Sequence, residues 1–159
     1  MNKTKIRILF CCMGNICRSP TAEGVTRTLA ERAGLASVFE FDSAGTHGFH
    51  IGNPPDKRAR QAAEGRGYDL SSLKARQVGT CDFSRFDHIL AMDRDNLDLL
   101  RQACPAEHQH KLGLFLEFST RFDEEEVPDP YYGGPEGFQR VLDLIEDAAN
   151  GLLDQLAKK

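Results

Sequence analysis

Short apolar runs alternate with amphipathic stretches along this chain, and the two patterns predict different elements. Residues 6–11, 38–44 and 86–92 are apolar runs of strand length, and 111–115 is a weaker one. Strands that alternate with helices favour a parallel sheet that is covered on both faces. We therefore expect an α/β fold: a three-layer sandwich with a central four-stranded parallel sheet flanked by helices on both faces.

The stretches between these runs carry apolar residues at helical spacing. In the first of them, Ser19 is expected as the N-cap, Pro20 as the first helical residue and Gly34 as the end. Further helices are expected over 56–64 and 93–102. The clearest amphipathic pattern runs to the C-terminus through Phe138, Val141, Leu142, Ile145, Ala149, Leu152 and Leu156.

Length and composition fit one globular domain spanning residues 1–159. The chain is 40% hydrophobic and 28% charged, which is typical of a folded protein rather than a disordered one. Its formal net charge of -4 and the lack of a basic stripe argue against a nucleic-acid partner. No apolar run approaches the roughly 18 residues that span a bilayer, so we expect no membrane partner.

Cysteine and histidine usage indicates a reduced, metal-free protein. The five cysteines are odd in number and unevenly spaced, and the N-terminus lacks the pattern of a secretory signal, so we expect a cytoplasmic protein. The five histidines form no metal-ligand set, and His108 and His110 are expected at the surface. The sequence thus predicts neither a metal nor a cofactor.

The chemistry is concentrated between the first predicted strand and the first predicted helix, in residues 12–18 (Cys-Met-Gly-Asn-Ile-Cys-Arg). Cys12 meets the positive end of the helix dipole and several backbone N–H groups there, which favour its nucleophilic thiolate. Arg18 adds a planar fork that can hold two oxygens of a phosphate. Ser19 can donate a hydrogen bond to the sulfur.

Two residues inside this loop suit a ring of inward-facing N–H groups. Gly14 permits close backbone approach or a positive φ, and Asn15 tolerates the left-handed region. Successive N–H groups can then form a nest for a small anion. The alternative is a buried cysteine at a strand end followed by an ordinary glycine turn, and the combined spacing disfavours it. We therefore expect an enzyme that acts on a phosphate or a similar oxyanion.

Residues 12–19, preceded by Leu9-Phe10-Cys11, closely resemble the signature of the low-molecular-weight protein tyrosine phosphatases. The resemblance continues in order along nearly the whole chain, through Asp42-Ser43-Ala44-Gly45, Gly52-Asn53-Pro54-Pro55-Asp56, Lys74-Ala75-Arg76-Gln77-Val78, Met92-Asp93 and Asp129-Pro130-Tyr131-Tyr132-Gly133. It implies a metal-independent enzyme without a cofactor that hydrolyses phosphotyrosine and small aryl phosphates through a cysteinyl-phosphate intermediate. The expected partners are a phosphotyrosine-containing protein and, in the loop, phosphate or another oxyanion.

The resemblance also assigns roles to individual residues. Cys12, Arg18 and Asp129 are the expected catalytic residues, with Asp129 in what resembles the family's general-acid loop. An acid there would protonate the leaving oxygen, because an expelled alkoxide or phenoxide is a poor leaving group. An aromatic slot at the entrance suits a flat phenyl phosphate. The expected substrate-binding residues are Met13, Gly14, Asn15, Ile16, Cys17, Phe49, Tyr131 and Tyr132.

Other residues have expected supporting or redox roles. Ser19 and Ser43 are expected to support the loop together with Asn15. Leu73 departs from some relatives, which have a histidine there that joins the network supporting the loop. In the family, a cysteine at the position of Cys17 can form a disulfide with the nucleophile and protect it from irreversible oxidation. The remaining cysteines are expected to be core or surface thiols: Cys11, Cys81 and Cys104.

Two other functions compete with this interpretation. A thiol-relay arsenate reductase shares the fold and a similar loop, but it needs two further cysteines close together on a mobile segment. Cys81 and Cys104 are 23 positions apart, with a predicted strand and helix between them. A non-catalytic phosphotyrosine-binding module would lack the nucleophile or the acid, and both are present. The sequence favours the phosphatase, as a monomer or weak homo-oligomer, and leaves its physiological substrate open.

Overall fold

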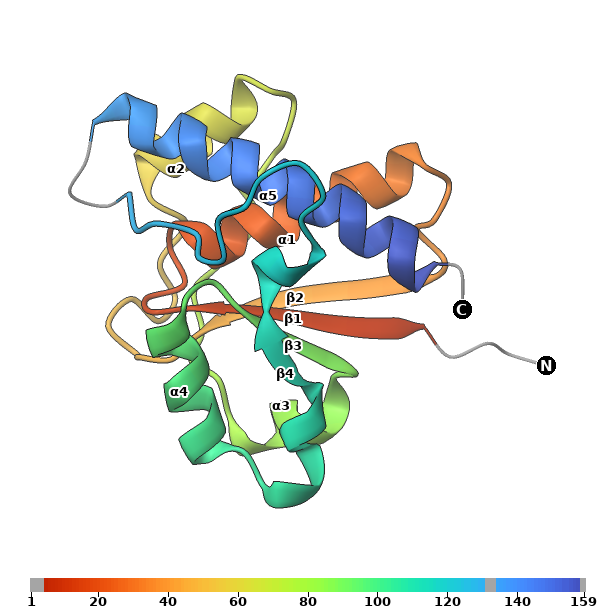
Figure 1. Cartoon of the computed structure of the whole chain (residues 1–159). Helices are drawn as coiled ribbons and strands as arrows, with labels where there is room; N and C mark the ends of the chain where they lie inside the picture. Colours follow the sequence, from red (N-terminus) through yellow and green to blue (C-terminus); the bar gives the residue numbers. More distant parts are fainter. Residues whose placement is uncertain (1–4, 131–133, 158–159) are drawn as a thin grey trace.

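Four parallel strands form the central layer of the molecule (Figure 1). The computed structural model describes residues 5–130 and 134–157. The strands are β1 (Ile6–Cys12), β2 (Phe39–Gly45), β3 (His88–Ala91) and β4 (Leu112–Leu114). They are arranged in the order β2-β1-β3-β4, and every neighbouring pair is parallel. The expected four-stranded parallel sheet is therefore confirmed.

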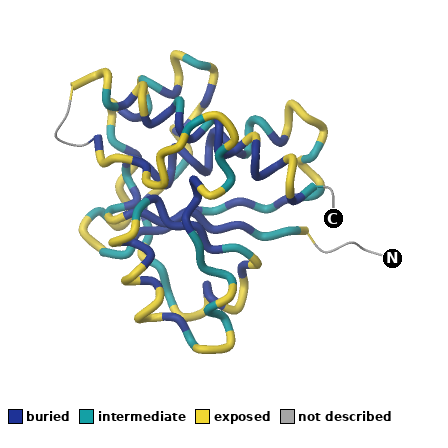
Figure 2. The backbone as a smooth tube through the Cα atoms, in the orientation of Figure 1, coloured by how far each residue is buried: buried dark blue, intermediate teal, exposed yellow. Residues whose placement is uncertain are grey.

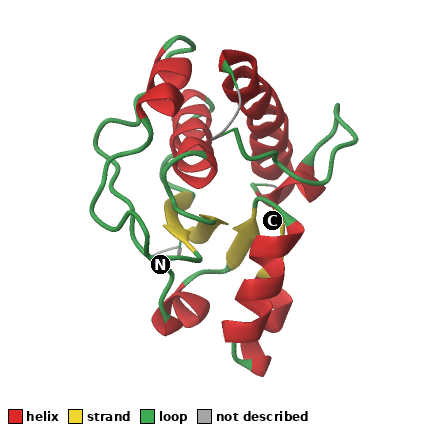
Figure 3. Ribbon diagram, turned by 90° about the vertical axis from the view of Figure 1, so that its left-hand side faces the viewer, coloured by secondary structure: helices red, strands yellow, loops and turns green. Residues whose placement is uncertain are grey.

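Helices cover both faces of this sheet (Figures 1 and 3). One face carries α1 (Arg18–Arg32), α2 (Lys57–Glu64) and α5 (Pro135–Leu156), with the short 3-10 helix η2 (Phe115–Phe118) against α5. The other face carries α3 (Thr80–Arg85), α4 (Arg94–Ala103) and the 3-10 helix η1 (Ala106–Lys111). This arrangement is the predicted three-layer sandwich. Within residues 5–130 and 134–157, no helix is long and apolar enough to cross a membrane.

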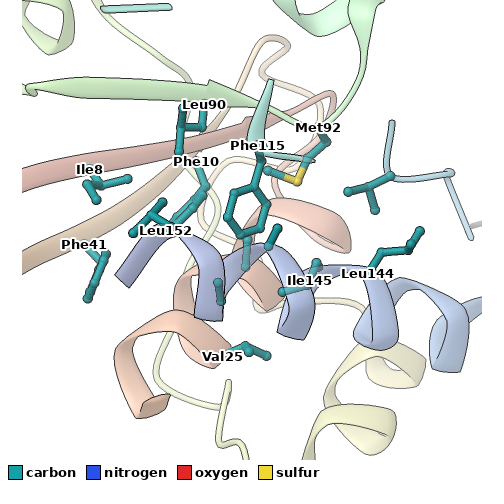
Figure 4. Packing of buried hydrophobic residues seen from close by; sticks show 14 of the residues in the cluster. Ile8, Phe10, Val25, Phe41, Leu90, Met92, Phe115, Leu144, Ile145 and Leu152 are labelled. Atoms are coloured by element: carbon teal, nitrogen blue, oxygen red, sulfur yellow. The ribbon is translucent and has the colours of Figure 1, made fainter. Parts of the chain in front are cut away.

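Side chains along β1 alternate between two separate cores. Phe10 and Cys12 belong to the larger core under α1 and α5, where the Phe10 ring packs edge-on against Phe115 with centroids 4.9 Å apart (Figure 4). Leu9 and Cys11 belong to the smaller core under α3 and α4. Figure 2 shows buried residues concentrated along the strands and on the inner sides of the helices. The period-two alternation of a strand therefore points the Cys11 and Cys12 thiols to opposite faces.

Helix α1 begins earlier than the sequence predicts. Arg18 is its first residue and Cys17 takes the N-cap position, so the prediction of Ser19 as N-cap and Pro20 as first helical residue is wrong. Pro20 is tolerated because the N–H groups of a first turn have no partner within the helix. The end of the helix agrees with the prediction, since Gly34 follows it with a φ of 75°.

The other predicted helices are present. Asp56 caps α2 by accepting a hydrogen bond from the Arg58 backbone N (2.8 Å), and Asp93 caps α4 by accepting one from the Asn96 backbone N (2.8 Å). Strand β3 is shorter than the predicted 86–92. Helix α3 is missing from the sequence prediction, because its six residues carry too little periodicity to stand out.

The parallel order brings several connecting loops to one edge of the sheet. Strand β1 lies between β2 and β3, so the loops that follow these three strands meet at their carboxyl ends. The Thr46 backbone N donates to the Cys12 carbonyl (2.8 Å), and the Met92 backbone N donates to the Cys11 carbonyl (3.0 Å). Open parallel sheets bind ligands at this edge.

The packing of α5 against η2 yields a prediction at Gly151. A Cβ atom there would lie 1.8 Å from the Phe118 carbonyl oxygen, whereas a Cβ at Gly137 in the same helix would meet Pro130 at an ordinary 3.6 Å. We expect Gly151→Ala to lower the free energy of unfolding by ~2 kcal/mol through overpacking. Gly137→Ala should raise it by up to ~1 kcal/mol, because alanine has the higher helix propensity.

Urea unfolding of both variants and the parent protein measures these changes. A Gly151→Ala protein at least as stable as the Gly137→Ala protein would contradict the close packing of α5 on η2.

Candidate active site

The loop between β1 and α1, residues 13–17, curves around the carboxyl end of β1. Asn15 has a φ of 58° and is the only non-glycine residue with a positive φ among the residues that the structure describes. Asn15 thus takes the left-handed conformation that the sequence suggested. Gly14 permits a close approach instead, because a Cβ there would lie 2.9 Å from the His50 ring. Gly14 and Asn15 thus shape the loop in the two ways that the sequence predicts, by close approach and by a positive φ.

A chain of hydrogen bonds fixes the surroundings of the Cys12 sulfur. The Ser19 Oγ lies 3.0 Å from the Cys12 Sγ and accepts a hydrogen bond from the Asn15 Nδ2 (2.7 Å). The Asn15 Oδ1 in turn accepts from the Arg76 backbone N (3.0 Å). Because the Ser19 oxygen already accepts from Asn15, its own proton is available to the sulfur. The expected contact between Ser19 and Cys12 is therefore present.

Arg76 anchors the far end of this chain. Its guanidinium binds the Asp82 carboxylate through two hydrogen bonds (2.9 and 3.0 Å) and the Asp42 carboxylate through a third (3.1 Å). Although partial burial opposes it, hydrogen bonding to Asp82 and the charge of Asp42 raise the pKa of Arg76. Leu73 packs against the larger core. The Asn15 side chain is therefore held by the backbone of Arg76.

Ser43 makes a hydrogen bond to α1. Its Oγ donates to the Glu23 Oε1 in α1 (2.6 Å), and Arg27 donates to the other oxygen of the same carboxylate. Burial raises the pKa of Glu23. Ser43 thus ties β2 to the second turn of α1, and its support of residues 13–17 stays a prediction.

Arg18 is buried, with 3% of its surface exposed, and is held by groups distant in sequence. Its Nη1 donates to the Asp93 Oδ2 (2.6 Å) and to the Val127 carbonyl (3.0 Å), and its Nη2 lies 3.9 Å from the Asp129 Oδ2. Burial alone would lower the pKa of Arg18, but the Cys12 sulfur and Asp93 raise it above its ordinary value. Asp93 is a site residue that the sequence analysis missed. The available signal was its place directly after the predicted strand 86–92.

A pocket of about 300 Å³ opens beside the loop and collects most of the predicted site residues. It is lined by Cys12, Met13, Gly14, Ile16, Cys17, Arg18, Phe49, His50 and Asp129. Asn15 does not line it, because its buried side chain supports the loop from behind. Tyr131 and Tyr132 lie outside the described residues. His50 is an addition that the sequence analysis did not assign to the site; it lines the pocket next to Gly14.

The cysteines differ in their surroundings. Cys17 lines the pocket, and its buried side chain packs with Ala59 and Phe138 in a small apolar cluster. Burial, and next the charge of Asp56, raises the pKa of Cys17 to about 12. As expected, the other thiols are core or surface groups: Cys11 and Cys104 are buried, and Cys81 is exposed.

The acidic segment before Asp129 is attached by ion pairs. Glu125 and Glu126 pair with Arg94 at the start of α4, and Glu124 pairs with Arg140 in α5. The three glutamate side chains are exposed. The Val127 backbone N then donates to the Met92 carbonyl (2.8 Å), which places Asp129 at the pocket.

Together these groups place a thiol, a fixed guanidinium and a carboxyl group around one small space. This combination can hold a tetrahedral oxyanion, attack it and exchange a proton with a leaving group. In the parts of the chain that the structure describes, no three His, Cys, Asp or Glu side chains are grouped as a metal site.

Comparisons with known proteins agree on one family. A family model for low molecular weight phosphotyrosine protein phosphatase matches residues 7–159. The chain is 39% identical to the low molecular weight protein-tyrosine-phosphatase YfkJ of Bacillus subtilis, over 97% of each chain. It is also 39% identical to the human low molecular weight phosphotyrosine protein phosphatase, over 93% of this chain and 94% of the human one. The crystal structure of an Entamoeba histolytica protein tyrosine phosphatase with Hepes in its active site matches with a TM-score of 0.94 and 42% identity, over 97% of this chain and 98% of that one.

The pocket geometry predicts selective alkylation of its thiols. Cys17, with a pKa of about 12, carries roughly one thiolate in 10⁴ molecules at pH 8, and this fraction rises about tenfold with each further pH unit. We expect iodoacetate at pH 8 to modify Cys12, whose sulfur lines the pocket, and to leave Cys17 intact. Peptide mapping by mass spectrometry measures the two rates.

Inorganic phosphate should slow the modification of Cys12 and leave that of Cys81, an exposed thiol outside the pocket, unchanged. Modification of Cys17 as fast as that of Cys12 at pH 8 would contradict the described environment.

Proposed function

The chain belongs to the low-molecular-weight phosphotyrosine protein phosphatase family, a family of hydrolases, and we propose that it hydrolyses phosphotyrosine and small aryl phosphates through a cysteinyl-phosphate intermediate. The observation that carries the proposal is the single pocket formed by Cys12, Arg18 and Asp129. Each of the three has a role in that reaction.

In the first step, the phosphate group of the substrate binds the backbone N–H groups of residues 13–17 and the Arg18 guanidinium. The Cys12 thiolate attacks phosphorus, the bond to the tyrosine oxygen breaks, and Asp129 gives its proton to that oxygen so that a neutral phenol leaves. Arg18 stabilises the charge that develops on the phosphoryl oxygens. The fixed position of its Nη1 against Asp93 reduces the reorganisation that this requires.

In the second step, water attacks the phosphorus of the cysteinyl phosphate. Asp129, now a carboxylate, accepts a proton from the water, and the sulfur leaves as a thiolate. The Ser19 hydroxyl, 3.0 Å from the Cys12 sulfur, stabilises this thiolate both as nucleophile and as leaving group. Inorganic phosphate is the second product, so the reaction is balanced without a metal or an organic cofactor.

The pocket walls support an aromatic phosphate as substrate. Phe49 lies at the opening, and its ring stacks on His47 with centroids 5.0 Å apart. The family resemblance adds Tyr131 and Tyr132 to this wall. A flat ring between aromatic side chains favours phosphotyrosine over the shorter phosphoserine. We further propose a reducing compartment, the cytoplasm, because all five cysteines are free.

Arsenate reduction by a thiol relay remains the second candidate, and the cysteine positions disfavour it. Such a relay needs two accessible thiols beyond the nucleophile. Cys81 is exposed on α3, but Cys104 is buried at the end of α4, where burial raises its pKa. Oxidation of thiols that depends on arsenate, without hydrolysis of phosphate esters, would favour this candidate.

Two substitutions test the catalytic roles with p-nitrophenyl phosphate and phosphotyrosine. Cys12→Ser should abolish turnover of both substrates. Asp129→Asn should lower kcat/KM, which reports the first step, about 10²-fold or more for phosphotyrosine, because removal of a general acid has effects of this size. The loss should be smaller for p-nitrophenyl phosphate, whose leaving group needs less protonation.

Asp123→Asn is the matched control, since it removes another exposed aspartate of the same segment and should leave kcat unchanged. Turnover that persists in Cys12→Ser, or equal losses of kcat/KM for the two substrates in Asp129→Asn, would refute the assigned roles.

We also propose that Cys17 protects the nucleophile from oxidation. Peroxide converts the Cys12 thiolate to a sulfenic acid, and the Cys17 thiol then displaces water from it to form a disulfide. Both cysteines line the same pocket, which supports this step. After peroxide treatment and then dithiothreitol, we expect full recovery of the parent protein and several-fold lower recovery of Cys17→Ser. Cys81→Ser should recover like the parent, and equal recovery of all three proteins would exclude the protective role.

A further inference from the structure

Two of the exposed large apolar side chains line the pocket, and a third lies two residues from one of them along the chain. The described residues include four exposed large hydrophobic side chains: Met13 (44% exposed), Phe49 (69%), Ile51 (60%) and Leu99 (39%). Met13 and Phe49 line the pocket, and Ile51 follows Phe49 by two residues, whereas Leu99 lies on α4. Clustered exposed apolar side chains mark interaction surfaces more often than isolated ones do. We name Met13, Phe49 and Ile51 the mouth patch.

The segment that carries the mouth patch is held in a fixed conformation. The His47 backbone N donates to the Met13 carbonyl (3.0 Å), which joins the segment to the loop after β1. At its other end, the Gly52 backbone N donates to the Ala75 carbonyl (2.8 Å). The Phe49 ring is supported by its stacking on His47. The apolar side chains are therefore presented to solvent by a tethered loop, which lowers the conformational entropy lost on binding.

The same segment lacks charge. Residues 43–55 contain no Lys, Arg, Asp or Glu, although 28% of the chain is charged. This segment by itself offers no charge complementarity to an acidic or basic peptide. The side chain that suits it is apolar, because removing two apolar surfaces from water stabilises their contact.

We propose that the mouth patch binds an apolar side chain next to the phosphotyrosine of a protein substrate. The inference rests on the proposed function, because a phosphate held at Cys12 and Arg18 places the phosphotyrosine ring in the pocket. The residues before and after it then emerge at the opening, since consecutive Cα atoms are only about 3.8 Å apart. Met13 and Phe49 line the pocket and also belong to the patch. A substrate peptide that fills the pocket therefore also contacts the patch.

Synthetic phosphopeptides test this selectivity. The reference peptide has alanine on both sides of the phosphotyrosine, and the test peptides replace the preceding or the following alanine with leucine or aspartate. We expect kcat/KM of the parent protein to be about fivefold to tenfold higher for at least one leucine peptide than for the alanine peptide. The gain should come through KM with kcat unchanged, because the contact is equally present in the ground state and the transition state.

Two matched variants assign the effect to the patch. Ile51→Ser should lower the leucine-to-alanine ratio about twofold or more, since one of the three apolar side chains of the patch is lost. Leu99→Ser removes another exposed apolar side chain, which lies on α4, and should keep the parent ratio. A parent ratio near one, a preference for aspartate, or a leucine preference that Ile51→Ser does not reduce would each overturn the inference.

Sedimentation distinguishes another occupant. Self-association of the parent protein that Ile51→Ser abolishes would identify the patch as a contact between two copies of this chain, and would also overturn the inference. The turnover of p-nitrophenyl phosphate by the parent protein distinguishes a failure of the proposed function from a failure of the inference about the patch. Its absence contradicts the proposed function itself, whereas normal turnover without peptide selectivity contradicts only the inference about the patch.

Discussion

The site depends on the hydrogen-bond chain that joins the Arg76 backbone, the Asn15 side chain and the Ser19 hydroxyl to the Cys12 sulfur. A left-handed conformation costs roughly 1 kcal/mol or more for a residue with a side chain, and Asn15 keeps it because both ends of its amide are bonded. Each buried polar group along the chain would cost free energy without its partner. The loop is thus held in the shape of an anion site by contacts that lie beneath it.

A second constraint is the buried charge of Arg18. A guanidinium in an apolar surrounding is stable only when it is paired and hydrogen-bonded, and Asp93, the Val127 carbonyl and Asp129 provide this. The same contacts fix the direction of the guanidinium before a substrate arrives. Because Asp129 faces both Arg18 and the pocket, the group proposed as the general acid also belongs to the electrostatic environment of the cation.

The pocket and the mouth patch extend this arrangement outward. The backbone of Met13 joins the phosphate loop to the segment after β2, and its exposed side chain belongs to the patch. The proposed chemistry thus lies at the bottom of the pocket, where buried charges dominate. The proposed selectivity lies at the opening, where the chain has no formal charge over residues 43–55. A conserved reaction and a variable choice of substrate can be separated in this way within one small domain.

Much of this could be predicted from the sequence, because strand alternation, helical spacing and the unusual loop at 12–18 are all local patterns. They determined the parallel α/β sheet, the thiol and guanidinium, and the left-handed Asn15. The start of α1 was predicted wrongly, because the Ser19 hydroxyl bonds to Asn15 and Cys12 rather than capping the helix.

Only the tertiary structure decided which distant groups meet this loop. Arg76 lies 61 residues from Asn15, and Asp93 lies 75 residues from Arg18. Their encounter follows from the order of the strands, which brings three carboxyl ends to one edge, and no local pattern encodes that order. The residue types of the reaction are therefore determined by short stretches of sequence. Their orientation, burial and charge balance arise from long-range packing, since these depend on neighbours that the chain supplies only when folded.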